Sequence, residues 1–260
     1  MSEPNYTTPP RAGETDGPDM STPSTLSGIF FEPGRTFEAL RARPRFLVAA
    51  LICVIAITGS YALYISRVGY DNVIDAEISM QRKKDPNANE EQLQQSARIQ
   101  KMPVVKVIRM FVIAVIMPII IAAVAGLYLL GVNLMGGEIG YKKALAVWAY
   151  SSLPPVIITT LLNVALLFAS PPDGDADIVR GENGLAHANP GVFVDATAHP
   201  VLSVLLSSFD LISFYGLFLA ALGLRKLGRL KSGSAWTIVL VLWGVVLVIR
   251  LFMAVVFGRA

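Results

Sequence analysis

The chain has few charged residues. Asp, Glu, Lys and Arg make up 16% of its 260 residues, and hydrophobic residues make up 53%. A soluble globular domain is about 25% charged and roughly 45–50% apolar, so a soluble enzyme and a wholly disordered chain are both excluded. Cysteine is nearly lacking as well, since Cys53 lies alone in an apolar run. An intramolecular disulfide is therefore excluded, and a thiolate zinc site is not expected.

Motifs of catalysis and of metal or cofactor binding are also missing. The chain contains no phosphate-cradling Gly-Lys-Ser/Thr loop, no His-Glu-x-x-His and no Gly-x-Ser-x-Gly. Asp173, Asp175 and Asp177 resemble the start of a calcium loop, but Ile178 and Gly184 stand where that loop requires Gly and Glu. We expect a protein that is not an enzyme and holds no metal or cofactor. The net charge of +3 fits Lys and Arg at membrane borders and does not indicate a nucleic-acid partner.

What the sequence does have is long apolar blocks. A helix needs about 20 residues to cross the hydrocarbon core of a bilayer, and five blocks reach that length: Phe46–Ser66, Met110–Met135, Ala144–Ala169, Val201–Leu224 and Ala235–Phe257. The pattern predicts an all-α, polytopic membrane protein within residues 28–257. Its five transmembrane helices are expected over about 46–66, 104–135, 144–169, 201–224 and 235–257.

The segment before the first span divides into two parts. Residues 1–27 are rich in Pro, Thr, Ser and Gly, which predicts a disordered tail. Residues 28–45 mix aromatic and aliphatic side chains with arginines: Phe30, Phe31, Phe37, Leu40, Arg35, Arg41, Arg43 and Arg45. Pro33 suits the first turn of a short helix, and Pro44 ends it. An amphipathic element of this kind predicts a helix in the membrane interface, with a plain juxtamembrane linker as the alternative.

Between the first two spans lies a polar insert, about 70–102. Asp85 and Pro86 interrupt its helical periodicity, and Asn89 with Gln92 resembles a capping pair that opens a second helix. The insert is predicted to form an extramembrane helical hairpin or an extension of the second span. Its Gln-, Lys-, Arg- and Glu-rich surface suits solvent or a protein partner.

Lys and Arg placement predicts the orientation. The segments before span one, after span two and after span four are basic, whereas the loop 170–200 is acidic. Basic loops stay in the cytoplasm, so the N-terminus is expected inside and the C-terminus outside. The segment 67–109 disagrees, because it holds eight basic and six acidic residues on the outer side. Ion pairs at helical spacing would neutralise it.

Ionisable residues at bilayer depth are costly and mark candidate sites. Asp210 lies within span four and Arg250 within span five, while Asn163 lies in span three and Arg109 at the mouth of span two. Antiparallel threading places all four in the same half of the membrane. Either Asp210 and Arg250 form a structural ion pair, or they line a polar cavity for a proton, an ion or a lipid headgroup, or they face different ways.

Two adjacent prolines, Pro154 and Pro155, lie near the middle of span three. Proline removes a backbone donor and clashes with the preceding turn, so the pair predicts a kink or a break. A kink shapes the helix bundle, whereas a broken helix marks a binding site in some transporters.

The start of span three carries a family resemblance. Gly136-Gly137-Glu138-Ile139-Gly140-Tyr141-Lys142-Lys143-Ala144-Leu145-Ala146, followed by Ala149-Tyr150 and Leu153-Pro154, resembles the central signature of the Yip domain family (Ypt/Rab-interacting membrane proteins). Phe31-Glu32-Pro33 with Thr36-Phe37 before the first span, and Gly223-Leu224-Arg225 before the last, fit as well.

This resemblance implies a bacterial-type member in the cytoplasmic membrane, with five helices and a cytosolic N-terminus. Eukaryotic relatives contact small GTPases through an Asp-Leu-Tyr-Gly-Pro motif that this chain lacks, so a GTPase partner is not expected. The leading hypothesis is a non-enzymatic membrane protein that organises lipid or partner proteins. The alternative is a small transporter or channel-like protein with its polar site at Asp210 and Arg250.

Overall fold

The apolar blocks form long helices in the computed structural model, which describes residues 18–182, 184–196 and 198–257. Four uninterrupted helices are long and apolar enough to cross a membrane. They are α3 (Leu47–Val68), α6 (Pro103–Leu134), α7 (Tyr141–Ala169) and α11 (Ser232–Phe257). A bent pair, α9 (Pro200–Ser207) and α10 (Leu211–Leu227), meets the same criterion when its two helices are taken together, and its bend of 49° is that of a broken span or a re-entrant loop. The described residues are all helix, turn and loop, which confirms the predicted fold class.

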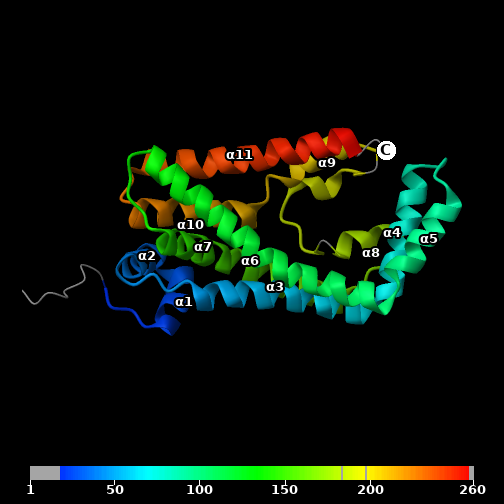
Figure 1. Ribbon diagram of the computed structural model, residues 1–260, viewed down its shortest axis with the longest axis horizontal. Coiled ribbons are helices and arrows are strands. Elements are labelled where there is room, and N and C mark those ends of the chain that lie inside the picture. Colours follow the sequence, from blue (N-terminus) through cyan, green and yellow to red (C-terminus); the bar gives the residue numbers. More distant parts are fainter. Residues whose placement is uncertain (1–17, 183, 197, 258–260) are drawn as a thin grey trace, which may run out of the picture.

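Helix α7 is the centre of the bundle. It packs against α3, α6 and α10, and Figure 1 shows α6 crossing the molecule diagonally, from beside α11 at one end to beside α3 at the other. The first half of α7 is buried on most faces because Ala144, Ala146 and Ala149 let neighbouring backbones approach closely. The outer faces of α6 and α11 expose large aliphatic side chains, as lipid-facing helices do.

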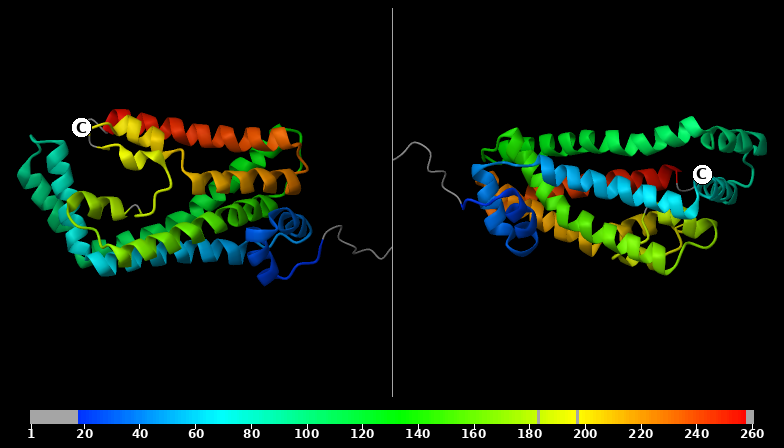
Figure 2. Two further views of the ribbon diagram at one scale, coloured as in Figure 1. Left: turned by 180° about the vertical axis from the view of Figure 1, so that it is seen from behind. Right: turned by 90° about the horizontal axis from the view of Figure 1, so that it is seen from below.

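The two ends of the bundle differ (Figure 2). One end, called here the basic end, carries α1 (Thr22–Phe31), α2 (Pro33–Ala42) and the turns that follow α6 and α10. The other, called the insert end, carries α4 (Tyr70–Lys84), α5 (Glu90–Gln100), α8 (Asp175–Glu182) and the 3₁₀ turn η1 (Pro190–Phe193). Helix α8 of the acidic loop packs on α4, so the insert and this loop form one structural unit.

The predicted disorder of 1–27 is wrong at its C-terminal side. Residues 1–17 lie outside the described part of the chain, but α1 begins at Thr22. The Ser21 side chain accepts a hydrogen bond from the Ser24 amide, which satisfies one of the orphan donors at the start of this helix. A capping serine thus starts a helix within this Ser/Thr/Pro-rich segment. The composition of the segment predicts disorder, but packing against the rest of the protein orders the helix.

The helix predicted in the membrane interface exists as α2, but protein covers its apolar face. Phe37 and Leu40 are fully buried, and α2 packs on α10. Gly223 of α10 makes room for Phe37, since a Cβ added there would lie 2.9 Å from the ring. The ion pair between Glu38 and Lys226 joins the same two helices. Phe37 and Leu40 therefore fill the core, whereas Phe31 is exposed. Sequence periodicity alone cannot distinguish such a core face from a lipid-facing one.

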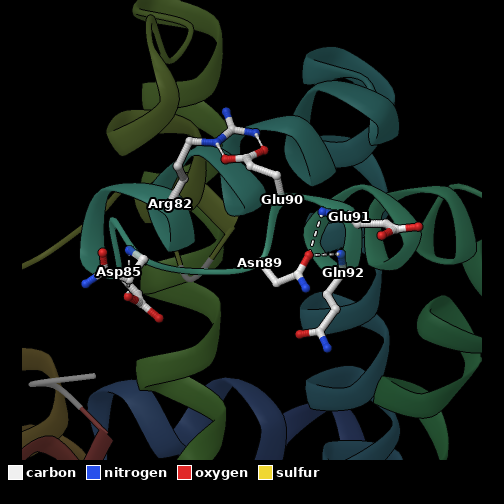
Figure 3. Close-up of polar contacts among 7 residues, drawn as sticks. Arg82, Asp85, Asn89, Glu90, Glu91 and Gln92 are labelled. Atoms are coloured by element: carbon white, nitrogen blue, oxygen red, sulfur yellow. Dashed lines mark hydrogen bonds and ion pairs between the residues drawn. The ribbon is translucent and has the colours of Figure 1, made fainter.

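The insert is the predicted hairpin (Figure 3). Asn89 caps α5, because its side-chain oxygen accepts from the Glu91 amide at 2.9 Å and the Gln92 amide at 3.3 Å. Arg82 of α4 makes a two-bond ion pair with Glu90 at 2.6 and 2.8 Å, and this pairing holds the pKa of Glu90 below its usual range. Helix α6 then starts at Pro103, so the second span also extends beyond its apolar block as expected.

Candidate functional site: a cavity beneath a docked loop

The ion pair between Asp210 and Arg250, one of the three arrangements that the sequence allowed, does not form. One oxygen of Asp210 accepts from the Ser213 amide at 2.8 Å, and the other accepts from the Ala188 amide at 3.1 Å and the Asn189 side chain at 3.4 Å. Both carboxylate oxygens are thus occupied by neutral donors. Arg250 is exposed on α11 and has no ion-pair partner within the described ranges.

Asp210 also explains why the fourth span is not continuous. It is the N-cap of α10, and Ser208–Asp210 separate this helix from α9. The prediction of one helix over 201–224 is therefore wrong at this point. The side chain of such an aspartate accepts hydrogen bonds from the backbone amides of the turn that follows it. This favours the start of a new helix at the aspartate over one continuous helix through it. The sequence signal was Asp210 with Ser213 three residues later, the spacing of an N-cap and the amide it accepts.

Asn163 binds the same loop from the opposite side. Its side-chain oxygen accepts from the Ala186 amide at 2.6 Å, and its amide group lies beside Gly184, whose φ of +109° is one that side chains rarely adopt. Residues 184–189, called here the docked loop, are therefore held by Asn163 of α7 and Asp210 of the α9–α10 break. The structure brings together two of the four predicted polar residues, and it joins them through backbone amides.

Arg109 lies apart from this pair. It makes a two-bond ion pair with Glu77 of α4 at 2.6 and 3.2 Å, at the insert end. Lys101 and Asp75 pair at 2.6 Å across the same junction. Four cations of the segment 67–109 thus pair with acids on other elements, and not with the i, i+4 partners that the sequence suggested: Arg82, Lys83, Lys101 and Arg109.

Beneath the docked loop lies a cavity of about 530 Å³ between α3, α6, α7 and α10. Hydroxyl and amide groups gather on its wall: Ser60, Tyr61, Tyr64, Thr159, Thr160, Asn163 and Ser213. Aliphatic and thioether side chains form the rest, among them Ile57, Ile113, Met117, Val156, Val164 and Ile212. Among the residues that the structure describes, no Asp, Glu, Lys, Arg or His lines it.

Most of these polar groups were missed from the sequence. The signal was present, because Ser60, Tyr61 and Tyr64 repeat the i, i+1, i+4 spacing of Thr159, Thr160 and Asn163. That spacing places three side chains on one face of a helix. Uncharged polar residues within an apolar run do not stand out as ionisable ones do, so only Asn163 was singled out.

Pro155 lines the same cavity, and Pro154 beside it is buried. Helix α7 runs through both residues, so the predicted alternative of a broken helix is wrong. Gly216 of α10 packs on Pro155, since a Cβ added at this glycine would lie 3.1 Å from the ring and 3.6 Å from the Ser151 carbonyl oxygen. The proline pair therefore contributes to the contact between α7 and α10.

The signature residues build the joint at the basic end. Gly136 has φ of +75°, and a Cβ added at Gly137 would lie 2.6 Å from the Gly228 carbonyl oxygen. That carbonyl accepts from the Glu138 amide at 3.2 Å, which joins the α6–α7 turn to the α10–α11 turn. Two glycines are thus required for different reasons, one for its backbone conformation and one for close approach.

Tyr150 connects the same signature to the N-terminal helices. It is fully buried, and its hydroxyl lies 2.9 Å from that of Thr25, which is itself 2% exposed. Since the Thr25 hydroxyl already donates to the Thr22 carbonyl at 2.8 Å, the Tyr150 hydroxyl is the donor between them. Ala144 is buried one turn and a half earlier, whereas Lys143 lines a cavity at the surface.

We expect Tyr150→Phe to lower the free energy of unfolding by about 1–3 kcal/mol, because a buried acceptor loses its donor. The measurement is the thermal midpoint of the protein purified in detergent. Tyr141→Phe is the matched control, since the Tyr141 hydroxyl donates to the Ala122 carbonyl but its side chain is exposed. Equal losses in the two variants would contradict the buried hydrogen bond.

Comparison with known proteins agrees with this architecture. Residues 27–254 match the Yip1 domain. The chain is 25% identical to the membrane protein YknW of Bacillus subtilis (strain 168) over 233 residues, which are 88% of this chain and 89% of that protein. No solved structure matches the chain. Since the matched region contains every helix from α2 to α10, the chain belongs to the Yip1 domain family and is a multi-pass membrane protein.

Proposed function

We propose that this protein is a non-enzymatic membrane protein that binds a neutral, lipid-like amphiphile in the cavity beneath the docked loop. The observation that carries the proposal is the lining, which combines hydroxyl and amide groups with aliphatic side chains and has no Asp, Glu, Lys, Arg or His among the described residues. An ion or proton in lipid requires charged or closely spaced oxygen ligands. A polar head with an apolar body matches both parts of this wall.

Size and position support the same ligand class. Pockets for small molecules measure about 300–1,000 Å³, and this cavity of about 530 Å³ falls within that range. It lies between membrane-spanning helices, so an amphiphile can reach it from the bilayer. The Tyr64 hydroxyl donates to the Ile178 carbonyl of α8 at 2.5 Å, which fixes the polar wall against the insert end.

A cavity-filling variant tests the proposal. We expect Thr159→Phe to remove most of the lipid that stays bound after purification, because the ring occupies space that the ligand needs. Bound lipid is measured by native mass spectrometry of the protein, with the thermal midpoint as a check on folding. Leu161→Phe adds a ring to the lipid-facing side of the same helix, where Leu161 is 65% exposed, and is the matched control. Equal lipid retention in the two variants would contradict binding in this cavity.

The broken fourth span favours a second candidate, a transporter. Discontinuous helices beside an intramembrane cavity form the substrate sites of several transporter folds, and here the break carries Asp210, which holds the docked loop. Opening of this loop would connect the cavity to the insert end. Transport requires the cavity to open to water at the insert end, whereas amphiphile binding requires access only from the bilayer.

Cysteine labelling separates the two candidates. Cys53 is the chain's single cysteine and is fully buried, so the background is low. We expect Thr160→Cys in the cavity to resist a membrane-impermeant maleimide, while Asn87→Cys on the exposed hairpin reacts rapidly. Rapid labelling of Thr160→Cys in proteoliposomes would favour transport and count against amphiphile binding from the bilayer alone.

We also propose that the basic end faces the cytoplasm. The basic segments before α3, after α6 and after α10 all lie at this end. At the insert end four cations of the segment 67–109 pair with acids, among them Lys83 with Asp175 of α8 at 3.6 Å. This matching removes the objection that the charged insert raised against the orientation. Labelling of Asn87→Cys in intact cells tests it, since an outside hairpin reacts and a cytoplasmic one does not.

A further inference from the structure

A second cavity, at the basic end, is lined almost entirely by charged side chains. It measures about 410 Å³ and is bounded by Glu38 and Arg41 of α2, by Arg225 and Lys226 of the last turn of α10, and by Arg229 of the following turn. Pro18 and Leu230 complete its wall. This cavity, called here the basic cavity, lies at the opposite end from the amphiphile cavity. A ligand bound there is independent of the function proposed above.

The positive charge of the basic cavity is not neutralised within the described protein. Its single carboxylate, Glu38, already pairs with Lys226. Arg41, Arg225 and Arg229 make no ion pair with any described residue. At the insert end, by contrast, Arg82, Lys83, Lys101 and Arg109 all pair with acids. Three guanidinium groups thus border one site without an ion-pair partner among the described residues, so an external anion can bind them.

The backbone holds Arg229 in an unfavourable conformation. Its φ of 54° lies in the left-handed region, which makes it exceptional among the non-glycine residues described. Glycine would adopt this conformation without strain, so a bulky cation stands where the backbone favours glycine. Strain of this kind is found where a side chain must be placed for function.

The surrounding turn is rigid enough to fix that placement. The Gly228 carbonyl accepts from Glu138, and Gly137 packs directly against it. Leu230, on the other side of Arg229, is 8% exposed. Arg229 also borders a neighbouring cavity of about 440 Å³ that contains Lys143 of the family signature. The signature glycines therefore clamp the turn that presents this arginine.

We propose that the basic cavity binds a phosphate group, carried either by the headgroup of an anionic phospholipid or by a soluble phosphate ester. Guanidinium groups form two parallel hydrogen bonds with phosphate oxygens, and several arginines around one site match its charge and its several acceptors. The turn after α10 directly follows a spanning helix, at the level where lipid phosphates lie. Carboxylate ligands offer fewer acceptors and fit this site less well.

The test compares phosphate sources on the full-length protein in detergent. Phosphatidic acid, phosphatidylcholine and inorganic pyrophosphate are added separately, and the thermal midpoint is measured. A ligand that binds the folded state at about a hundredfold excess over its Kd raises the midpoint by roughly 5 °C or more. We expect this shift with phosphatidic acid and none with phosphatidylcholine. An equal shift with pyrophosphate alone would support phosphate binding and identify a soluble ester as its source.

Two variants make the test specific. Arg229→Gly removes the charge and relieves the backbone strain, so we expect it to be at least as stable as wild type while its phosphate affinity falls about tenfold or more. Arg35→Gln removes one charge from α2 outside the cavity, where Arg35 pairs with Glu32 and is exposed. It should keep the full shift. The proposal is overturned if no phosphate source raises the midpoint, or if Arg229→Gly and Arg35→Gln respond alike.

Discussion

Replacing Asp210 by Ala is expected to lower the free energy of unfolding by about 2–4 kcal/mol. The substitution removes the N-cap of α10, which costs about 0.5–2 kcal/mol, and it releases two donors of the docked loop, where bonds to a charged acceptor contribute about 1.5–3 kcal/mol. Asp210→Asn should cost less, because one side-chain oxygen remains to accept from Ser213 or from Ala188. The thermal midpoint in detergent and proteolysis at residues 184–189 report the two effects separately.

Arg250→Gln is the control that separates this explanation from an ion pair. We expect it to change stability by less than about 0.5 kcal/mol, since Arg250 is exposed. The double variant with Asp210→Ala should equal Asp210→Ala alone within about 0.5 kcal/mol. Recovery of stability in the double variant would show that the two charges interact, as the sequence had suggested.

Gly137→Ala is expected to cost about 2–3 kcal/mol, at the upper end of the overpacking range. Its Cβ would lie 2.6 Å from the Gly228 carbonyl oxygen and 2.6 Å from a Leu230 methyl group. The leucine can rotate away, but the carbonyl belongs to the backbone of a turn and cannot. The α6–α7 and α10–α11 turns must separate, which breaks the bond from Glu138 to Gly228.

Gly140→Ala is the matched control for this prediction. It lies three residues later in the same turn, and a Cβ added there meets nothing within 4 Å. Gly140 is the N-cap of α7, where Ala is less favourable than Gly, so we expect a loss of about 1 kcal/mol or less in the thermal unfolding of the detergent-solubilised protein, clearly smaller than that of Gly137→Ala. A loss in Gly140→Ala as large as that in Gly137→Ala would mean that general turn flexibility, and not close approach, explains the signature.

The fold was predictable where a pattern depends on a single element. Apolar length predicted the spans, and Asn89 with Asp85-Pro86 predicted the hairpin, because caps and breaks act within a few residues. Features that depend on two distant elements were not predictable in this way. The apolar face of α2 was assigned to the membrane interface because nothing in its sequence shows that α10 covers Phe37.

The candidate site was predicted only in part, for the same physical reason. Asp210 and Asn163 were found because polar groups in an apolar run are costly. Their partners are backbone amides of the docked loop, and every amide has the same donor whatever its side chain. The sequence therefore does not show which amides Asp210 and Asn163 bind. It suggested Arg250 as the counter-ion of Asp210 instead.

The packing of α2 on α10 also sets an order for assembly. Glu38 and Lys226 lie 188 residues apart in the chain, so the ribosome completes three spans, α3, α6 and α7, before α10, the partner of α2, is made. During that time Phe37 and Leu40 lack the surface of α10 on which they finally pack. Contacts between segments so far apart in the chain form late. The N-terminal helix α2 is therefore among the last elements to reach its final packing, and a chain that stops before α10 leaves Phe37 and Leu40 without the helix that covers them.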